Sequence, residues 1–128
     1  MAAVPRRTRV LLVDDHELFV ESAKSVLAGD ARFEVVGVAM TGPEAVALAG
    51  ELTPDLVLMD IGLPGMDGYT LARELRALPQ GAAPRIVAIT GYGQPSDRDL
   101  SAAAGIDCHL VKPVDPAHLA QVLRGPPG

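Results

Sequence analysis

The chain has 128 residues, of which 48% are hydrophobic, and a net charge of -5 at pH 7. This length suits one domain with a sizeable core, and the acidic balance disfavours direct binding to nucleic acid or to anionic membranes. The longest apolar run, residues 45–49, is far shorter than the roughly 20 residues of a membrane-spanning helix. A single cysteine, Cys108, excludes an internal disulfide and a cysteine zinc cluster and favours a reducing, cytoplasmic setting.

Short apolar runs alternate with segments of helical period along the chain. The runs are rich in Val, Ile and Leu without polar alternation, which is typical of strands buried on both faces. They lie at residues 10–13, 35–39, 56–59 and 86–89, with a weaker fifth strand at 109–111. The apolar spacing between and after them predicts helices near residues 18–27, 45–52, 71–78, 100–104 and 117–123.

Capping residues agree with these helices. Thr41 and Glu44 have capping-box spacing, Asp115 precedes a first-turn proline, and Gly105 is expected to stop the fourth helix. Right-handed crossovers turn such an alternation into an α/β fold, a doubly wound parallel five-stranded sheet with helices on both faces. We expect this domain to span residues 8–124, between a flexible lead-in, 1–7, and a tail or truncated linker, 125–128.

The residues that follow each predicted strand are candidates for function. In an open α/β sheet, ligands bind beyond the carboxyl ends of the strands. Asp14 and Asp15 follow the first strand, Asp60 the third, Thr90 the fourth and Lys112 the fifth. Three carboxylates at one edge repel one another, and oxygen ligands predict a hard counter-ion, most plausibly Mg²⁺ with several retained waters.

Asp60 is the best nucleophile candidate, because it stands alone at the end of an apolar strand. A carboxylate can accept a phosphoryl group as an acyl phosphate, a transfer catalysed mainly by positioning and charge neutralisation. Mg²⁺ held by Asp15 and Asp60 would neutralise one side of the group, and Lys112 the other. The Thr90 hydroxyl would donate to a phosphoryl oxygen. We also hypothesise that the bond between Lys112 and Pro113 is cis.

With these residues in place, the chain resembles the receiver domain of two-component response regulators over nearly all its length. The resemblance rests on the motifs at residues 10–15, 56–60 with 63–68, 90–91 and 112–113, in the family's order and approximate spacing. It implies a flavodoxin-like fold with strand order 2-1-3-4-5. It also implies a domain that catalyses its own phosphorylation and acts mainly as a signalling switch.

The resemblance implies a role for each site residue. Asp60 would be the phosphoacceptor, and Asp14, Asp15 and the Gly62 carbonyl would bear on Mg²⁺, Asp14 through water. Thr90 and Lys112 would contact the phosphoryl group. The donor would be a phosphohistidine on a sensor histidine kinase or a histidine phosphotransfer protein.

Some residues depart from the family's pattern. His109 stands three residues before Lys112, where the family commonly has Phe or Tyr, so the usual aromatic switch is in doubt. Gly62 and Tyr92 occupy positions that influence phosphoryl lifetime in the family, and together they leave that lifetime open. The sequence ends after the last predicted helix, so we expect output through a protein target that binds the surface formed by residues 100–104, 109–111 and 117–123. Homodimerisation stays open.

Other interpretations remain beside this one. His16 is interpreted as a solvent-facing residue at a helix start, not as a ligand. A haloacid-dehalogenase-like phosphatase would need an Asp-x-Asp motif where the chain has residues 14–17, Asp-Asp-His-Glu. A flavin or nucleotide binder would need a Gly-rich or Ser/Thr-rich phosphate loop at the same place. The last alternative is a receiver-like scaffold that is not phosphorylated.

Overall fold

The computed structural model describes residues 7–62, 66–78, 84–90, 103–111 and 116–123. Its five strands form one sheet of order β2-β1-β3-β4-β5 in which all neighbours run parallel. The strands are β1 (Thr8–Val13), β2 (Phe33–Ala39), β3 (Leu56–Asp60), β4 (Arg85–Thr90) and β5 (Cys108–Val111). The helices are α1 (Glu17–Ala28), α2 (Gly42–Leu52), α3 (Gly68–Arg76) and α5 (Pro116–Leu123). The predicted doubly wound, flavodoxin-like fold is confirmed.

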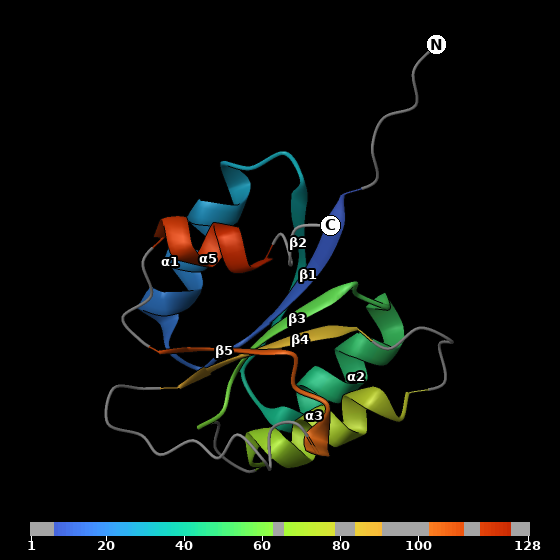
Figure 1. The fold of residues 1–128 in the computed structure, drawn as a ribbon. Coiled ribbons are helices and arrows are strands. Elements are labelled where there is room, and N and C mark those ends of the chain that lie inside the picture. The colour runs from blue at the N-terminus through green and yellow to red at the C-terminus, as the bar shows by residue number, and fades with distance from the viewer. Residues whose placement is uncertain (1–6, 63–65, 79–83, 91–102, 112–115, 124–128) are drawn as a thin grey trace.

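Two layers of helices cover the sheet, with α1 and α5 on one face and α2 and α3 on the other (Figure 1). Successive residues of a strand point to opposite faces, so a strand buried on both sides feeds two cores. Val10 and Leu12 of β1 belong to the cluster that contains Leu119 of α5. Leu11, between them, belongs to the cluster that contains Leu71 of α3. The absence of polar alternation in the central strands follows from this double burial.

Side chains that cap α2 and α3 fix where these helices begin. Thr41 Oγ1 accepts a hydrogen bond from Glu44 N at 3.2 Å, as the capping-box spacing predicts. Asp67 Oδ1 accepts from Thr70 N at 2.9 Å, and Asp67 Oδ2 accepts from Thr70 Oγ1 at 2.9 Å. These bonds hold the pKa of Asp67 below its usual range.

The predicted helix at residues 100–104 falls mostly outside the described residues, although residues 103 and 104 are helical. Gly105 then has a φ of +89°, the left-handed conformation that suits a glycine after a helix. The expected cap at Asp115 also lies outside the described residues. None of the helices in the described part of the chain has the length and hydropathy that crossing a membrane would require.

Candidate functional site

Strand pairing brings the polar residues of the sheet's carboxyl edge together. Val13, the last residue of β1, pairs with Met59 of β3, and Asp60 pairs with Ile89 of β4. Asp14, directly after β1, therefore ends up beside Asp60. The predicted convergence of carboxylates at one edge is a consequence of this register.

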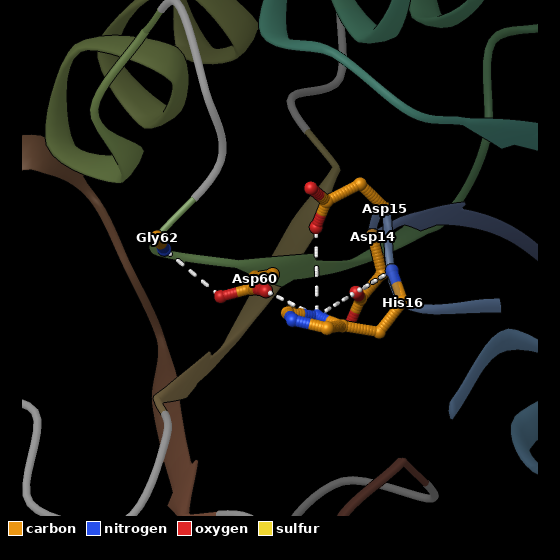
Figure 2. Close-up of polar contacts among 5 residues, drawn as sticks. All are labelled: Asp14, Asp15, His16, Asp60 and Gly62. Carbon is orange, nitrogen blue, oxygen red and sulfur yellow. Dashed lines mark hydrogen bonds and ion pairs between the residues drawn. The ribbon is translucent and has the colours of Figure 1, made fainter. Parts of the chain in front are cut away.

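Four side chains form an acidic cluster at this edge, and we use this name for Asp14, Asp15, His16 and Asp60. Each residue offers one ligand atom, and these atoms all lie within 4.8 Å of one another. Asp14 and Asp60 are buried, whereas Asp15 and His16 are exposed. Figure 2 shows the imidazole of His16 reaching between the three carboxylates. Its Nδ1 atom lies 2.8 Å from Asp14 Oδ1, 3.2 Å from Asp60 Oδ2 and 3.5 Å from Asp15 Oδ1.

Backbone amides orient the two buried carboxylates of the acidic cluster. Gly62 N donates to Asp60 Oδ1 at 2.8 Å, so the other oxygen, Oδ2, is the one that contacts His16 (Figure 2). His16 N donates to Asp14 Oδ1 at 2.8 Å. Hydrogen bonds from backbone N–H groups stabilise the charged form of a carboxylate and fix its direction. Both acids are thus held in place by the loops that follow their own strands.

His16 is the cluster member that the sequence argument missed. It is the N-cap residue of α1, and its side chain is 63% exposed, which agrees with a solvent-facing helix start. It also lies within hydrogen-bond or ion-pair distance of all three aspartates, which the sequence argument did not foresee. The signal available in the sequence was its position directly after the aspartate pair.

The other candidate residues lie on β4, on β5 or outside the described residues. Thr90, at the end of β4, is buried, and its Oγ1 donates to Leu110 O over a long 3.4 Å distance. His109 is half-buried on β5 and pairs with Ala88 of β4 in the sheet. Lys112, Pro113 and Tyr92 lie outside the described residues, so their predicted roles and the hypothesis of a cis bond stay predictions.

The loop after Asp60 is held by a close backbone approach. Ile61 N donates to Ile89 O at 3.0 Å, and Gly68 N donates to Ile61 O at 3.2 Å. A Cβ atom on Gly68 would lie 2.8 Å from the Cα of Ile61, closer than real side chains come. Only a glycine therefore lets the start of α3 pack against the residue that follows Asp60.

The donor set of the acidic cluster fits a divalent cation. Carboxylate and carbonyl oxygens are the ligands of hard ions such as Mg²⁺. An octahedral Mg²⁺ site has ligands at about 2.1 Å, which places opposite ligands about 4.2 Å apart. The 4.8 Å spread of the cluster atoms is close to that span, so small side-chain movements bring them into a common shell. Gly62, two residues after Asp60, starts the loop predicted to offer a carbonyl.

Comparisons with known proteins agree with this geometry. The sequence model of the response regulator receiver domain matches residues 10–124. The chain is similar to response regulator PleD of Caulobacter vibrioides, with 37% identity over 116 residues, covering 91% of this chain and 25% of that protein. It is also similar to response regulator protein VraR of Staphylococcus aureus, with 33% identity over 117 residues, covering 91% of this chain and 54% of that protein. The chain thus spans about a quarter and about half of these relatives.

Solved structures give the same result for the fold. A CheY-like receiver domain protein from Methanospirillum hungatei superposes with a TM-score of 0.81 at 31% identity, covering 92% of this chain and 91% of that one. The chemotaxis response regulator CheY4 of Vibrio cholerae superposes with a TM-score of 0.81 at 29% identity, covering 92% and 97% of the two chains. Both superpositions cover nearly the whole of this chain.

Proposed function

The chain belongs to the family of response regulator receiver domains, the phosphoacceptor modules of two-component systems, and from this premise we propose that Asp60 is its phosphoacceptor residue. The observation that carries the proposal is the gathering of three aspartates at the carboxyl edge of the sheet, with ligand atoms within 4.8 Å of one another. Asp60 is the member on the central strand β3, buried and directed by Gly62 N.

The proposed reaction moves a phosphoryl group from nitrogen to oxygen. A carboxylate oxygen of Asp60 attacks the phosphorus of a phosphohistidine while the P–N bond breaks. The electron pair of that bond returns to the donor's imidazole, which takes up a proton from water. Oδ2 of Asp60 faces the acidic cluster, so we assign the attack to Oδ1. The N–H of Gly62, 2.8 Å from Oδ1, stands ready to donate to the transferring group.

Receiver domains generally bind Mg²⁺ at an acidic cluster, and this chain has a candidate cluster of that kind. We propose that Asp14, Asp15, Asp60 Oδ2 and the Gly62 carbonyl hold the ion, with Asp14 acting through water. When bound, Mg²⁺ offsets the charge of the carboxylates and of the phosphoryl oxygens. The buried pair, Asp14 and Asp60, forms the floor of the proposed site, and exposed Asp15 forms its solvent side.

Thr90 and Lys112 complete the proposed site. Among the described residues, the Thr90 hydroxyl donates to Leu110 O over a long 3.4 Å distance, so turning it toward a phosphoryl oxygen costs little. Thr90 pairs with Val111, the last residue of β5, which Lys112 follows in the sequence. We propose that Lys112 supplies the positive charge opposite the metal.

The proposed partners follow from the family. Receiver domains work with kinases or phosphotransfer proteins on one side and with downstream targets on the other. We propose that a sensor histidine kinase or a histidine phosphotransfer protein donates the phosphoryl group. Movement of Thr90 toward that group would shift β5, including His109, and so change the affinity of the surface predicted from residues 100–104, 109–111 and 117–123 for a protein target.

Incubation with acetyl phosphate and Mg²⁺, followed by intact-mass measurement, tests the assignment of Asp60. We expect the wild-type chain to gain one phosphoryl mass, Asp60→Asn to gain none, and the gain to disappear with EDTA. The matched control is Asp30→Asn, an acid just before β2, and so at the opposite end of the sheet, that pairs with Arg32 and should not matter. A folded Asp60→Asn variant that still gains the mass would disprove the assignment.

No described feature favours the alternative functions. The cavity beside Asp14, of about 320 Å³, is lined by three acids, Asp14, Glu17 and Glu21, and by one base, Lys24, so its net negative charge disfavours the phosphates of a flavin or nucleotide. The Asp-x-Asp motif of the phosphatase class is absent from residues 14–17. The complete acidic cluster argues against a scaffold that is never phosphorylated.

A further inference from the structure

The imidazole of His16 occupies a place in the acidic cluster that the proposed reaction does not use. Its Nδ1 lies 2.8 Å, 3.2 Å and 3.5 Å from one oxygen each of Asp14, Asp60 and Asp15. One nitrogen thus contacts the three carboxylates that are proposed to bear on the divalent ion.

The distances from His16 Nδ1 to these oxygens are similar to the distances between neighbouring ligands of one metal ion. With metal–ligand bonds of about 2.1 Å, adjacent corners of an octahedron lie about 3 Å apart. His16 Nδ1 is near that separation from the oxygens of Asp60 and Asp15, the carboxylates proposed to bind the ion directly, so it sits where another corner of the same shell would fall. The four ligand atoms spread over 4.8 Å, and small rotations of the side chains close this to an octahedral span.

The local backbone holds the imidazole at this position. His16 is the N-cap residue of α1, with φ −89° and ψ 102°, and its N–H donates to Asp14 Oδ1 at 2.8 Å. The ring therefore starts from a residue that is anchored to the cluster itself. Its side chain is 63% exposed, so it closes the solvent side of a site whose floor is buried. Binding an ion through Nδ1 needs only small rotations of the side chains in the acidic cluster.

We propose that His16 is itself a metal ligand through Nδ1 and tunes which ion the site prefers. This proposal rests on the ion site of the proposed function. Mg²⁺ favours oxygen ligands, whereas an imidazole nitrogen adds affinity for transition ions such as Mn²⁺ and, more strongly, Ni²⁺. A mixed shell of carboxylates and one imidazole raises the affinity for Mn²⁺ and Ni²⁺ relative to Mg²⁺. The residue after the aspartate pair thereby sets the selectivity of the site.

Calorimetric titration of the full chain with Mg²⁺, Mn²⁺ and Ni²⁺, at one fixed pH, tests this role. We expect His16→Ala to weaken Ni²⁺ and Mn²⁺ binding by about tenfold or more while Mg²⁺ affinity changes far less, because Mg²⁺ gains little from a nitrogen ligand. Glu17→Ala is the matched control, since Glu17 is the next residue and an exposed acid outside the acidic cluster. It should leave the ratio of affinities at the wild-type value.

Pulsed EPR of the Mn²⁺-loaded chain gives a second measurement that does not depend on phosphorylation. A coordinated imidazole produces nitrogen modulation, which we expect in the wild type and in Glu17→Ala and not in His16→Ala. Equal strengthening of all three ions in His16→Ala would overturn the proposal, because His16 would then compete with the ion. If the wild type gains phosphoryl mass on Asp60 yet lacks the modulation, the role of His16 fails while the proposed function stands.

Discussion

Carboxylates stand singly at the amino end of the sheet and in a cluster at its carboxyl end. At the amino end, Asp55 Oδ2 accepts from Arg9 N at 2.9 Å, and Asp107 Oδ2 accepts from Ile86 N at 2.7 Å. Asp107 also pairs with Arg76 at 2.8 Å. Each of these acids has its own donors, which fix the entry of a strand.

At the carboxyl end, Asp14, Asp15 and Asp60 crowd together, and one oxygen of each lies within 3.5 Å of a single nitrogen of His16. Crowding like charges costs folding energy unless a cation offsets it. Acids that stand singly at the amino end stabilise the entries of strands, whereas acids gathered around one point suit the ion of the proposed function.

The largest difference in stability is expected between two variants, one that lacks an acid at the amino end and one that lacks an acid at the carboxyl end. Asp107→Ala leaves Ile86 N and Arg76 without their carboxylate, and we expect a loss of about 2 to 3 kcal/mol in the free energy of unfolding. Asp15→Ala should cost nothing measurable or stabilise the metal-free chain, because it relieves repulsion. The two side chains are similarly exposed, at 39% and 36%, so burial does not explain the difference.

Urea denaturation in the presence of EDTA measures both variants. Equal losses for Asp107→Ala and Asp15→Ala would contradict the distinction between the two ends. A larger loss of unfolding free energy in Asp15→Ala would mean that contacts within the acidic cluster stabilise the metal-free fold more than the crowding of its charges destabilises it.

The loop after Asp60 gives the next effect. In Gly68→Ala the added Cβ would lie 2.8 Å from Ile61 Cα, so the backbone beside Asp60 must move. We expect a loss of about 2 kcal/mol and slower phosphorylation by acetyl phosphate. Gly29→Ala is the control, because its added Cβ would meet Val26 O at an ordinary 3.6 Å. Normal phosphorylation in Gly68→Ala would show that the position of Ile61 does not matter to the site.

Much of the fold and of the acidic cluster could be predicted from the sequence, for physical reasons. Unbroken apolar runs reflect burial on both faces, and parallel strands bring their carboxyl ends to one edge. Asp14, Asp15 and Asp60 stand directly at those ends, so their convergence requires only the strand order. The fold and these three residues therefore depend on local patterns and one topological rule.

The contacts of His16 and Asp107 could not be predicted in the same way. The direction of the His16 ring depends on the backbone angles of one loop residue, which no periodicity encodes. The pair between Arg76 and Asp107 joins residues 31 positions apart, from the end of α3 to the entry of β5. Such contacts arise from packing after the elements are placed, and the sequence carries no spacing that marks them.

Mg²⁺ should raise the free energy of unfolding by binding at the carboxyl end of the sheet alone. With Mg²⁺ at about ten times its Kd, preferential binding to the folded state adds about 1.4 kcal/mol to the free energy of unfolding. Asp14→Asn and Asp60→Asn should respond less at the same concentration, and Asp30→Asn should respond like the wild type. Thermal unfolding with and without EDTA measures this. An equal gain in every variant would place the ion away from the acidic cluster.

The smallest effect concerns Asp67, an acid of the carboxyl end that lies outside the acidic cluster and caps α3. Hydrogen bonds from Thr70 lower its pKa below the ordinary 3.8. A lowered folded-state pKa means that its charge stabilises the fold above the unfolded value, and this contribution is lost as pH falls through the folded value. We expect Asp67→Ala to cost about 1 kcal/mol at neutral pH, the usual size for an N-cap.

The difference between wild type and Asp67→Ala should shrink when urea denaturation is repeated below about pH 4, where the unfolded carboxyl is protonated. Asp67→Asn separates capping from charge, because an amide oxygen still accepts from Thr70 N. Asp67→Asn should lose less unfolding free energy than Asp67→Ala at neutral pH. Its difference from the wild type should be smaller in acid. A difference that stays constant with pH would show that Asp67 stabilises α3 by its shape and not by its charge, which would place it outside the contrast between paired and gathered acids.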